Sequence, residues 1–366
     1  EIVGHEARWT ALVRAFAKDS VPQTLLISGA RHVGKTTLAK RFAKLLLCPQ
    51  RVEIEGLPEP CGKCRTCHQI DIETFPDFRI FRPIVSSAKE ERDWVTAPED
   101  LEGSILTVDV ARKFGDEAIR RPMIGARKVM VLAQAERMNI EAQNSLLKTF
   151  EEPARGLTII LLTENARELL PTVLSRCWHL PLGLAHDDAT QSWLGRTFPA
   201  VAPAVLQEAV AVAGGRPGAA WREIERLARG GEETMPRFAQ MTQLVARIEK
   251  SQPVGALGLT EETLRLAKEW WAEDHADGDK TGKKGDAKVV RSSVVRVLDE
   301  LAIAYRARWK AAIAGAQGAE AFAVGLDQIR KTRHYILRNA NTNLALDVLF
   351  GRLIALNSGT TLGPRR

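Results

Sequence analysis

One stretch near the start of the chain has the residue types and spacing that hold the phosphate groups of a nucleotide. It matches the pattern G-x-x-x-x-G-K-[ST], in which backbone N–H groups surround the phosphates and a lysine contacts them. The residues that we predict to bind nucleotide are Gly29, Ala30, Arg31, His32, Val33, Gly34, Lys35, Thr36 and Thr37. An apolar run precedes this loop and a pattern of helical period follows it, which is the order that phosphate binding needs. We therefore expect bound ATP or ADP, with Mg²⁺ held by Thr36.

The strand that should supply catalytic acids ends without them. ATPases with this loop usually place an Asp for Mg²⁺, and often a Glu for the attacking water, directly after a buried strand. Here the apolar run over residues 129–132 is followed by Ala133 and Gln134. Phosphoryl transfer then lacks electrostatic stabilisation at the reacting groups, so we expect little or no intrinsic hydrolysis. The nearest acid, Glu136, is either a substitute or, as we expect, a solvated or capping residue.

Four cysteines form a second cluster with the spacing C-x12-C-x2-C-x2-C. They are Cys48, Cys61, Cys64 and Cys67. Four thiolates suit tetrahedral Zn²⁺ in a closed structural site, with free or disulfide-bonded thiols as the alternative and His68 as a rival ligand. The segment, about residues 48–70, is too small for a hydrophobic core of its own, so we expect the metal to hold it together. Cys177 stands apart, and we interpret it as a small buried residue.

Three further stretches complete a resemblance that spans the chain. They are residues 139–153, residues 169–177 and the Asn-rich residues 336–347. Together with the two clusters above, they resemble bacterial clamp-loader subunits of the AAA+ class, and most closely the delta-prime family of DNA polymerase III subunits. The sister gamma/tau subunits normally keep an Asp-Glu pair where this chain has Ala133 and Gln134, which favours the delta-prime type. Many delta-prime subunits also keep acids there, so this chain departs from the pattern of the family that it resembles at that motif.

The resemblance implies roles for several residues. Arg176, in the sequence Ser-Arg-Cys, would be an arginine finger acting in trans, because a planar, permanently charged guanidinium can meet the γ-phosphate of a neighbouring subunit. A structural arginine is the alternative. Thr163 would be the sensor of the γ-phosphate, unless it is an ordinary strand-end threonine. Active relatives carry a second sensor arginine where Gly218 aligns here, and Arg216 lies two positions too early to replace it. Residues 2–5 would lie near the adenine.

The order of the patterns predicts an α/β domain followed by all-α domains. We expect a doubly wound parallel sheet of the AAA+ P-loop type over residues 1–182, with the zinc module inserted, and a helical lid over residues 183–230. Residues 231–366 read as helical, and by the resemblance they form the collar that fastens subunits into a ring. Within them, Trp270 and Trp271 should pack in a helical core, and the polar residues 273–288 should form a mobile loop.

Charge and composition add few constraints. The chain has 52 Lys and Arg against 45 Asp and Glu, a net charge of +7, which permits contact with phosphates without indicating a nucleic-acid module. No apolar run approaches membrane-spanning length and no signal-peptide pattern is seen, so we expect a cytoplasmic protein with no membrane contact. By the resemblance, its partners would be gamma/tau and delta subunits, the sliding clamp indirectly, and primed DNA within the assembly.

The sequence therefore predicts a delta-prime-like stator that binds ATP, hydrolyses it poorly and lends an arginine to a neighbouring ATPase. Its own ATPase should be weak or absent. Two alternatives remain open at this point: an active ATPase of the gamma/tau type, and a nucleotide-gated AAA+ adaptor outside replication.

Overall fold

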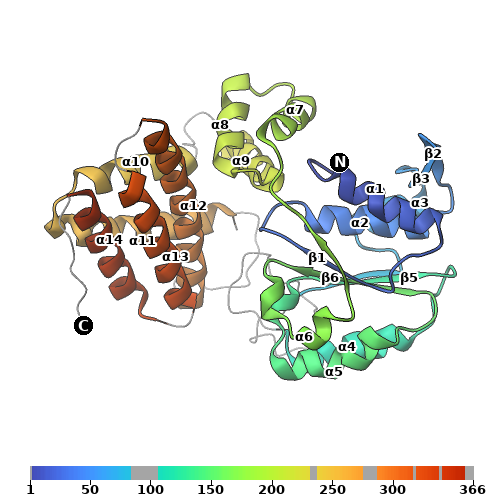
Figure 1. The fold of residues 1–366 in the computed structure, drawn as a ribbon. Coiled ribbons are helices and arrows are strands. Elements are labelled where there is room, and N and C mark those ends of the chain that lie inside the picture. The colour runs from blue at the N-terminus through green and yellow to red at the C-terminus, as the bar shows by residue number, and fades with distance from the viewer. Residues whose placement is uncertain are drawn as a thin grey trace. The chain divides into compact units, whose positions relative to one another are not determined.

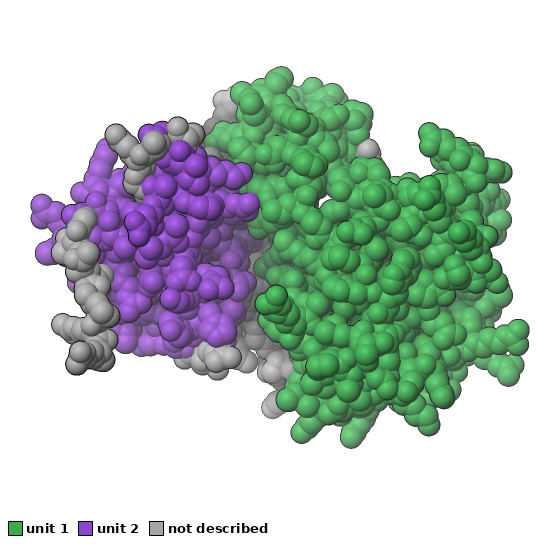
Figure 2. Space-filling view, in the orientation of Figure 1, with its two compact units in different colours: residues 1–99, 104–221 green, residues 100–103, 222–366 purple. Residues whose placement is uncertain are grey.

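The chain forms two compact units. The computed structural model describes residues 2–83, 106–230, 237–274, 287–315, 319–337 and 340–358. The units meet in sequence between Trp221 and Arg222 (Figure 2). The predicted loop over residues 273–288 lies mostly outside the described residues, and the predicted three-domain division at residues 182 and 230 stays a prediction.

A five-stranded parallel sheet forms the centre of the first unit (Figure 1). Its strands are β1 (Thr24–Ser28), β4 (Phe78–Phe81), β5 (Lys128–Leu132), β6 (Leu157–Thr163) and β7 (Trp178–Pro181). Their order across the sheet is β4-β5-β6-β1-β7, and each neighbouring pair is parallel. Because β1, β5 and β6 are buried along their whole length, their sequences are dominated by apolar runs rather than alternating. The loops that follow these three strands leave the sheet at one edge, with β6 in the middle.

Helices cover both faces of this sheet (Figure 1). The covering helices are α1 (Glu6–Ala17) and α2 (Lys35–Leu47) on one face, and α4 (Val108–Ile119), α5 (Ile140–Glu151) and the short α6 (Pro171–Leu174) on the other. Successive residues of one strand point to opposite faces of the sheet and so enter two different hydrophobic cores. Leu25 packs in the core that contains Phe42, and Leu26 packs in the core that contains Phe114. This is the doubly wound α/β arrangement that the sequence predicted.

The cysteine-bearing segment is an insertion between α2 and β4. It contains an antiparallel hairpin, β2 (Val52–Ile54) and β3 (Leu57–Glu59), and the helix α3 (Arg65–Asp71). Glu59 anchors the hairpin to the main body, because it accepts hydrogen bonds from the Arg41 guanidinium at 3.0 Å and from the Trp9 indole. The same guanidinium lies over the Trp9 ring, 4.3 Å from its centroid. The insertion is therefore attached through α1 and α2.

Three helices follow the sheet: α7 (Asp187–Thr197), α8 (Pro203–Ala213) and α9 (Pro217–Gly230). Aromatic side chains hold together the part of this segment that belongs to the first unit. The Trp221 ring stacks on the Trp193 ring with centroids 5.4 Å apart, and its centroid lies 4.7 Å from that of Phe198. A backbone bond from the Ala185 N–H to the Gly215 carbonyl at 2.8 Å joins the start of the segment to the turn between α8 and α9.

The described residues of the second unit form helices and no strand. Its main helices are α10 (Arg237–Lys250), α11 (Ala256–Asp274), α12 (Ala287–Ala314), α13 (Ala319–Leu337) and α14 (Thr342–Asn357). Trp270, Tyr305 and Phe350 are buried in its core, and the Trp270 indole donates to the Gln240 amide at 2.8 Å. Trp270 thus packs in a helical core as predicted, and the fold class of an α/β domain followed by helices is confirmed. No helix in the described part of the chain is long and apolar enough to span a bilayer.

Candidate functional site

All nine residues predicted to bind nucleotide lie in the loop between β1 and α2 and in the first turn of α2. The Gly29 N–H donates to the Thr163 carbonyl at 3.1 Å, which ties the start of the loop to β6. Gly34 has a φ of +106°, a conformation that favours glycine, and it caps the N-terminus of α2. The Lys35 ammonium donates to the carbonyls of Gly29 and Ala30 at 2.8 and 2.9 Å. The amine is therefore held inside the loop, where a phosphate oxygen would be a stronger acceptor.

Two segments from outside the loop close against its tip. The Gly218 N–H at the start of α9 donates to the His32 carbonyl at 2.9 Å, and the His5 ring nitrogen Nε2 lies 3.0 Å from the Val33 carbonyl oxygen. A Cβ added to Gly218 would lie 2.9 Å from the His32 oxygen, so the position of the second sensor has no room for a side chain in this arrangement. Arg216 instead donates through Nε to the Ala213 carbonyl at 2.8 Å.

The end of β5 carries no carboxylate. The Ala133 N–H donates to the Phe81 carbonyl at 2.9 Å, and Gln134 adopts a left-handed backbone with a φ of 54°. This turn begins the short 3-10 helix η1 (Ala135–Arg137) and directs Glu136 toward the end of β6.

Glu136 is not solvated, which was one of the two roles, solvated or capping, that we expected from the sequence. Its carboxyl contacts the Thr163 hydroxyl and the backbone of Glu164, and its Oε2 atom is buried without a hydrogen-bond partner. Burial raises the pKa of this carboxyl, while the hydrogen bonds to it act in the opposite direction. Thr163 is itself fully buried, and its hydroxyl accepts from the Asn165 N–H at 3.2 Å. The sensor role of Thr163 stays a prediction, because a local bond of this kind also suits an ordinary strand end.

Arg176 lies two residues after the end of α6 and is partly exposed. Its Nη1 atom donates to the Thr172 carbonyl at 2.8 Å, and its Nη2 atom donates to the Glu151 carboxylate at 3.0 Å. The next residue, Cys177, is half-buried beside the core under α5. Its thiol donates to the Val173 carbonyl at 3.2 Å, and burial raises its pKa to about 12. Glu151 was not identified from the sequence as a partner of Arg176.

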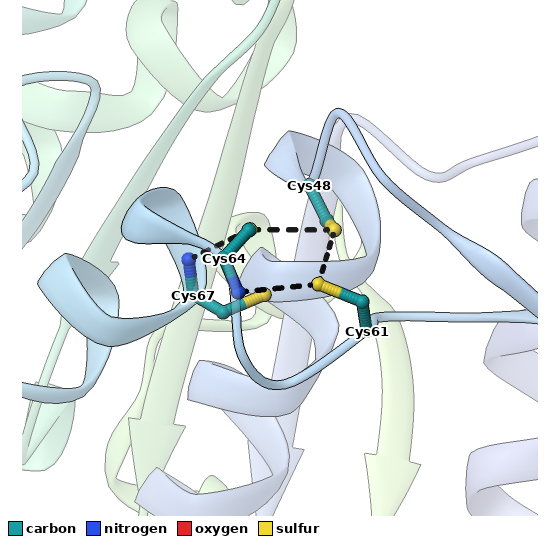
Figure 3. Close-up of side chains that lie close together, drawn as sticks. All are labelled: Cys48, Cys61, Cys64 and Cys67. Carbon is teal, nitrogen blue, oxygen red and sulfur yellow. Dashed lines mark hydrogen bonds between the residues drawn. The ribbon is translucent and has the colours of Figure 1, made fainter.

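The four predicted zinc ligands converge on one point (Figure 3). Their sulfur atoms all lie within 4.8 Å of one another, and Cys48 Sγ is 3.7 Å from Cys61 Sγ and 3.8 Å from Cys64 Sγ. Sulfurs about 2.3 Å from a tetrahedral zinc ion are about 3.8 Å apart, so the spacing fits Zn²⁺. His68 is exposed on α3 and lies outside this group.

The backbone around the cysteines also suits thiolate ligands. The Cys64 N–H points to Cys61 Sγ at 3.3 Å and the Cys67 N–H points to Cys64 Sγ at 3.4 Å, an arrangement that stabilises negative sulfur. The backbone N–H of Lys63 lowers the pKa of the Cys61 thiol to about 6, whereas burial raises the pKa of Cys48 and Cys67. The cluster can therefore bind a metal such as zinc.

Comparison with known proteins identifies relatives of the first unit. Residues 4–185 match the family described as DNA polymerase III, delta subunit. The chain is 32% identical over 227 residues to a DNA polymerase III subunit delta' of Pseudomonas aeruginosa, covering 62% of this chain and 61% of that protein. It is 30% identical over 191 residues to a DNA polymerase III subunit tau/gamma of Haemophilus influenzae, covering 52% of this chain and 24% of that protein.

A solved structure also resembles the chain in outline. It is a DNA polymerase III gamma subunit-related protein of Thermotoga maritima, 16% identical, with a TM-score of 0.42 and coverage of 95% of this chain and 99% of that one. In sequence, the chain spans less than two thirds of the length of either curated relative named above. Through residues 4–185, the chain belongs to the delta-prime-like family of DNA polymerase III clamp-loader subunits.

Proposed function

We propose that this chain is a delta-prime-like stator of a clamp loader. It binds ATP or ADP, hydrolyses it poorly, and supplies Arg176 to the ATP of a neighbouring subunit while the ring loads a sliding clamp in DNA replication. The observation that carries the proposal is the pairing of a complete phosphate-binding loop with a strand β5 that ends in Ala133 and Gln134. A site of this kind can hold a nucleotide without the acid that would drive its hydrolysis.

In its own nucleotide site, the chain would contribute binding groups only. The Lys35 ammonium would exchange its two loop carbonyls for phosphate oxygens, and Thr36 would place its hydroxyl on Mg²⁺. The bound ion would neutralise phosphate charge. Gly218 adds no cation at the second sensor position, which agrees with weak turnover.

For the neighbouring subunit, the chain would contribute Arg176. The guanidinium is partly exposed and carries its N–H donors in a fixed plane. These properties suit contact with a γ-phosphate supplied from outside the chain. A clamp loader also implies gamma/tau and delta subunits as partners, with the sliding clamp and primed DNA met in the assembly.

The metal site would have a structural role. Four cysteines complete the zinc shell and leave no open position for chemistry. The zinc would fold the inserted segment, while Glu59 joins that segment to α1 and α2.

One observation favours an active gamma/tau-type ATPase as the second candidate. Glu136 brings a carboxyl to the end of β6, beside Thr163, and relatives of the chain include tau/gamma subunits. Against it, burial raises the pKa of this carboxyl, which makes it a weaker anionic ligand for Mg²⁺ than a solvated carboxylate. The relatives named above are all DNA polymerase III subunits, which favours clamp loading over an adaptor outside replication.

The test is the ATPase of the reconstituted assembly. The chain is combined with gamma/tau and delta subunits, and ATP turnover stimulated by primed DNA is compared between wild type and Arg176→Ala. An arginine finger contributes about 10³-fold or more at the site it serves, so total turnover should fall clearly while the ring stays assembled. Arg167→Ala is the matched control, because Arg167 is an exposed arginine on the nearby 3-10 helix η2 (Ala166–Glu168).

Three outcomes separate the candidates. Loss of turnover with Arg176→Ala alone supports the stator. Unchanged turnover in an intact ring makes Arg176 structural. A clear single-turnover rate from the isolated chain, lost in Glu136→Gln, supports the gamma/tau-type ATPase instead.

A further inference from the structure

We propose that Glu151 is the positioning residue for Arg176, holding its guanidinium in the orientation in which it meets the phosphate of the neighbouring subunit. The inference rests on the proposed function of Arg176. It concerns a residue on a different element, since Glu151 is the last residue of α5 and Arg176 follows α6.

The contacts of Arg176 fix the plane of its side chain. Nη2 donates to Glu151 Oε1 at 3.0 Å, and Nη1 donates to the Thr172 carbonyl at 2.8 Å, with the Ser175 hydroxyl 3.4 Å away. The Thr172 carbonyl belongs to the last turn of α6, whose carbonyls lack partners within the helix. Because a guanidinium is planar, one anchor on each terminal nitrogen is enough to set its orientation.

The two anchors leave one N–H of Nη2 for a further ligand. Glu151 uses one oxygen on one of the two hydrogens of Nη2, while Nε is buried and has no partner within the described structure. Two of the five N–H groups therefore remain without a hydrogen bond to Glu151, Thr172 or Ser175, and one of the two is the buried Nε. An incoming phosphate can use the remaining N–H of Nη2 while the anchors stay in place, which is what a positioning role requires.

The strength of the ion pair also suits this role. The side chains of Arg176 and Glu151 are 31% and 55% exposed, and pairs this open to water are weak. Such a pair orients the guanidinium but competes little with a phosphate, whose charge is larger. Glu151 lies in the stretch of residues 139–153 that the sequence singled out, and the function proposed above gives this residue no task.

The adjacent acid provides a matched control. Glu152 is exposed, carries the same charge, and follows Glu151 directly at the end of α5. The structure gives its side chain no hydrogen bond or ion pair with any described residue. Glu152→Gln therefore removes the same charge from the same surface without touching Arg176.

The experiment is a double-mutant cycle in the assembled ring with gamma/tau and delta subunits. We would compare wild type, Glu151→Gln, Arg176→Ala, the double variant and Glu152→Gln, measuring kcat and KM for ATP in primed-DNA-stimulated turnover. Melting curves and ring assembly should be alike in all five, because the pair is exposed. We expect Glu151→Gln to lower kcat about two- to fivefold with KM unchanged, the change that corresponds to losing an exposed ion pair. In the Arg176→Ala background, Glu151→Gln should leave kcat unchanged. Glu152→Gln should have the kcat and KM of wild type.

Any result that differs from this expectation overturns the inference. An equal loss from Glu151→Gln in both backgrounds would mean that Glu151 acts without Arg176. Unchanged or faster turnover would mean that Glu151 is dispensable, or that it withholds the arginine from the phosphate. If Arg176→Ala itself leaves turnover unchanged in an intact ring, the proposed function fails as well, and this result is distinct from a failure of Glu151 alone.

Discussion

The contact between α9 and the phosphate-binding loop leads to a prediction whose sign and size follow from the geometry. Replacing Gly218 by Ala adds one methyl group at the second sensor position. The new Cβ would lie 2.9 Å from the His32 carbonyl oxygen and 3.4 Å from the His32 Cβ. The first neighbour is backbone, so either the loop or the start of α9 has to shift.

Three free-energy contributions set how much Gly218→Ala destabilises the contact between the start of α9 and the loop. The shift breaks or weakens the bond from the Gly218 N–H to the His32 carbonyl, now 2.9 Å, at a cost of about 1 kcal/mol. Crowding of a packed contact costs about 1–3 kcal/mol more. Alanine is the better helix former by about 1 kcal/mol, which offsets part of this loss. The net expectation is that the closed contact is destabilised by about 1–3 kcal/mol.

Hydrogen exchange of the backbone amides measures this local effect. Two compact units need not unfold together, so a single midpoint of global unfolding would mix their stabilities. We expect peptides covering residues 29–34 and the start of α9 to exchange about 5- to 150-fold faster in Gly218→Ala.

A second glycine of the same helical segment serves as the control. Gly195 lies in α7, and a Cβ added there meets nothing within 4 Å. Gly195→Ala should therefore stabilise its helix by about 0.5–1 kcal/mol and slow exchange there. If Gly218→Ala exchanged like wild type, or more slowly, the steric argument would be wrong.

Two further predictions concern the metal and a buried acid. Metal analysis should find one zinc ion per chain. Cys64→Ser or a strong chelator should remove the zinc and make residues 48–70 sensitive to protease. A metal-free protein in which this segment resists protease would contradict the assignment. For Glu136, burial places the folded-state pKa above the unfolded value, so the carboxyl lowers stability once pH rises above about 4.5 and does so fully above the folded pKa. Glu136→Gln cannot ionise and should raise the melting temperature at pH 8 but not at pH 4; equal gains at both pH values would show that ionisation is not the cause.

Much of the site could be predicted from short stretches of sequence. The phosphate-binding loop and the cysteine cluster are patterns in which neighbouring residues set the local backbone, and their positions in the structure agree with the order strand, loop, helix. Strands β1, β5 and β6 were visible as apolar runs because both faces of the sheet are covered. The absence of the catalytic acids could also be predicted from the sequence. The positions for these acids directly follow strand β5, and Ala133 and Gln134 occupy them.

Glu136 shows where this kind of inference stops. Its distance from the strand suggested a solvated or capping residue, but the left-handed turn at Gln134 directs its carboxyl to Thr163 and away from solvent. Hydrophobic periodicity contains no information on the direction of such a turn. The buried Asp77 was missed for a related reason, because its carboxylate accepts backbone N–H bonds from Met123 and Ile124, which are distant in sequence.

The sequence by itself therefore determined which chemical groups the chain has: a loop for phosphate, four thiols for a metal, an arginine after α6, and no acid at the end of β5. Only the tertiary structure decided what these groups contact. The strand order places β6 between β1 and β5, the packing of α5 beside α6 brings Glu151 to Arg176, and the start of α9 meets His32. The physical reason is that local patterns reflect the conformational preferences of adjacent residues, whereas these contacts join residues far apart in the chain and form only when whole elements pack.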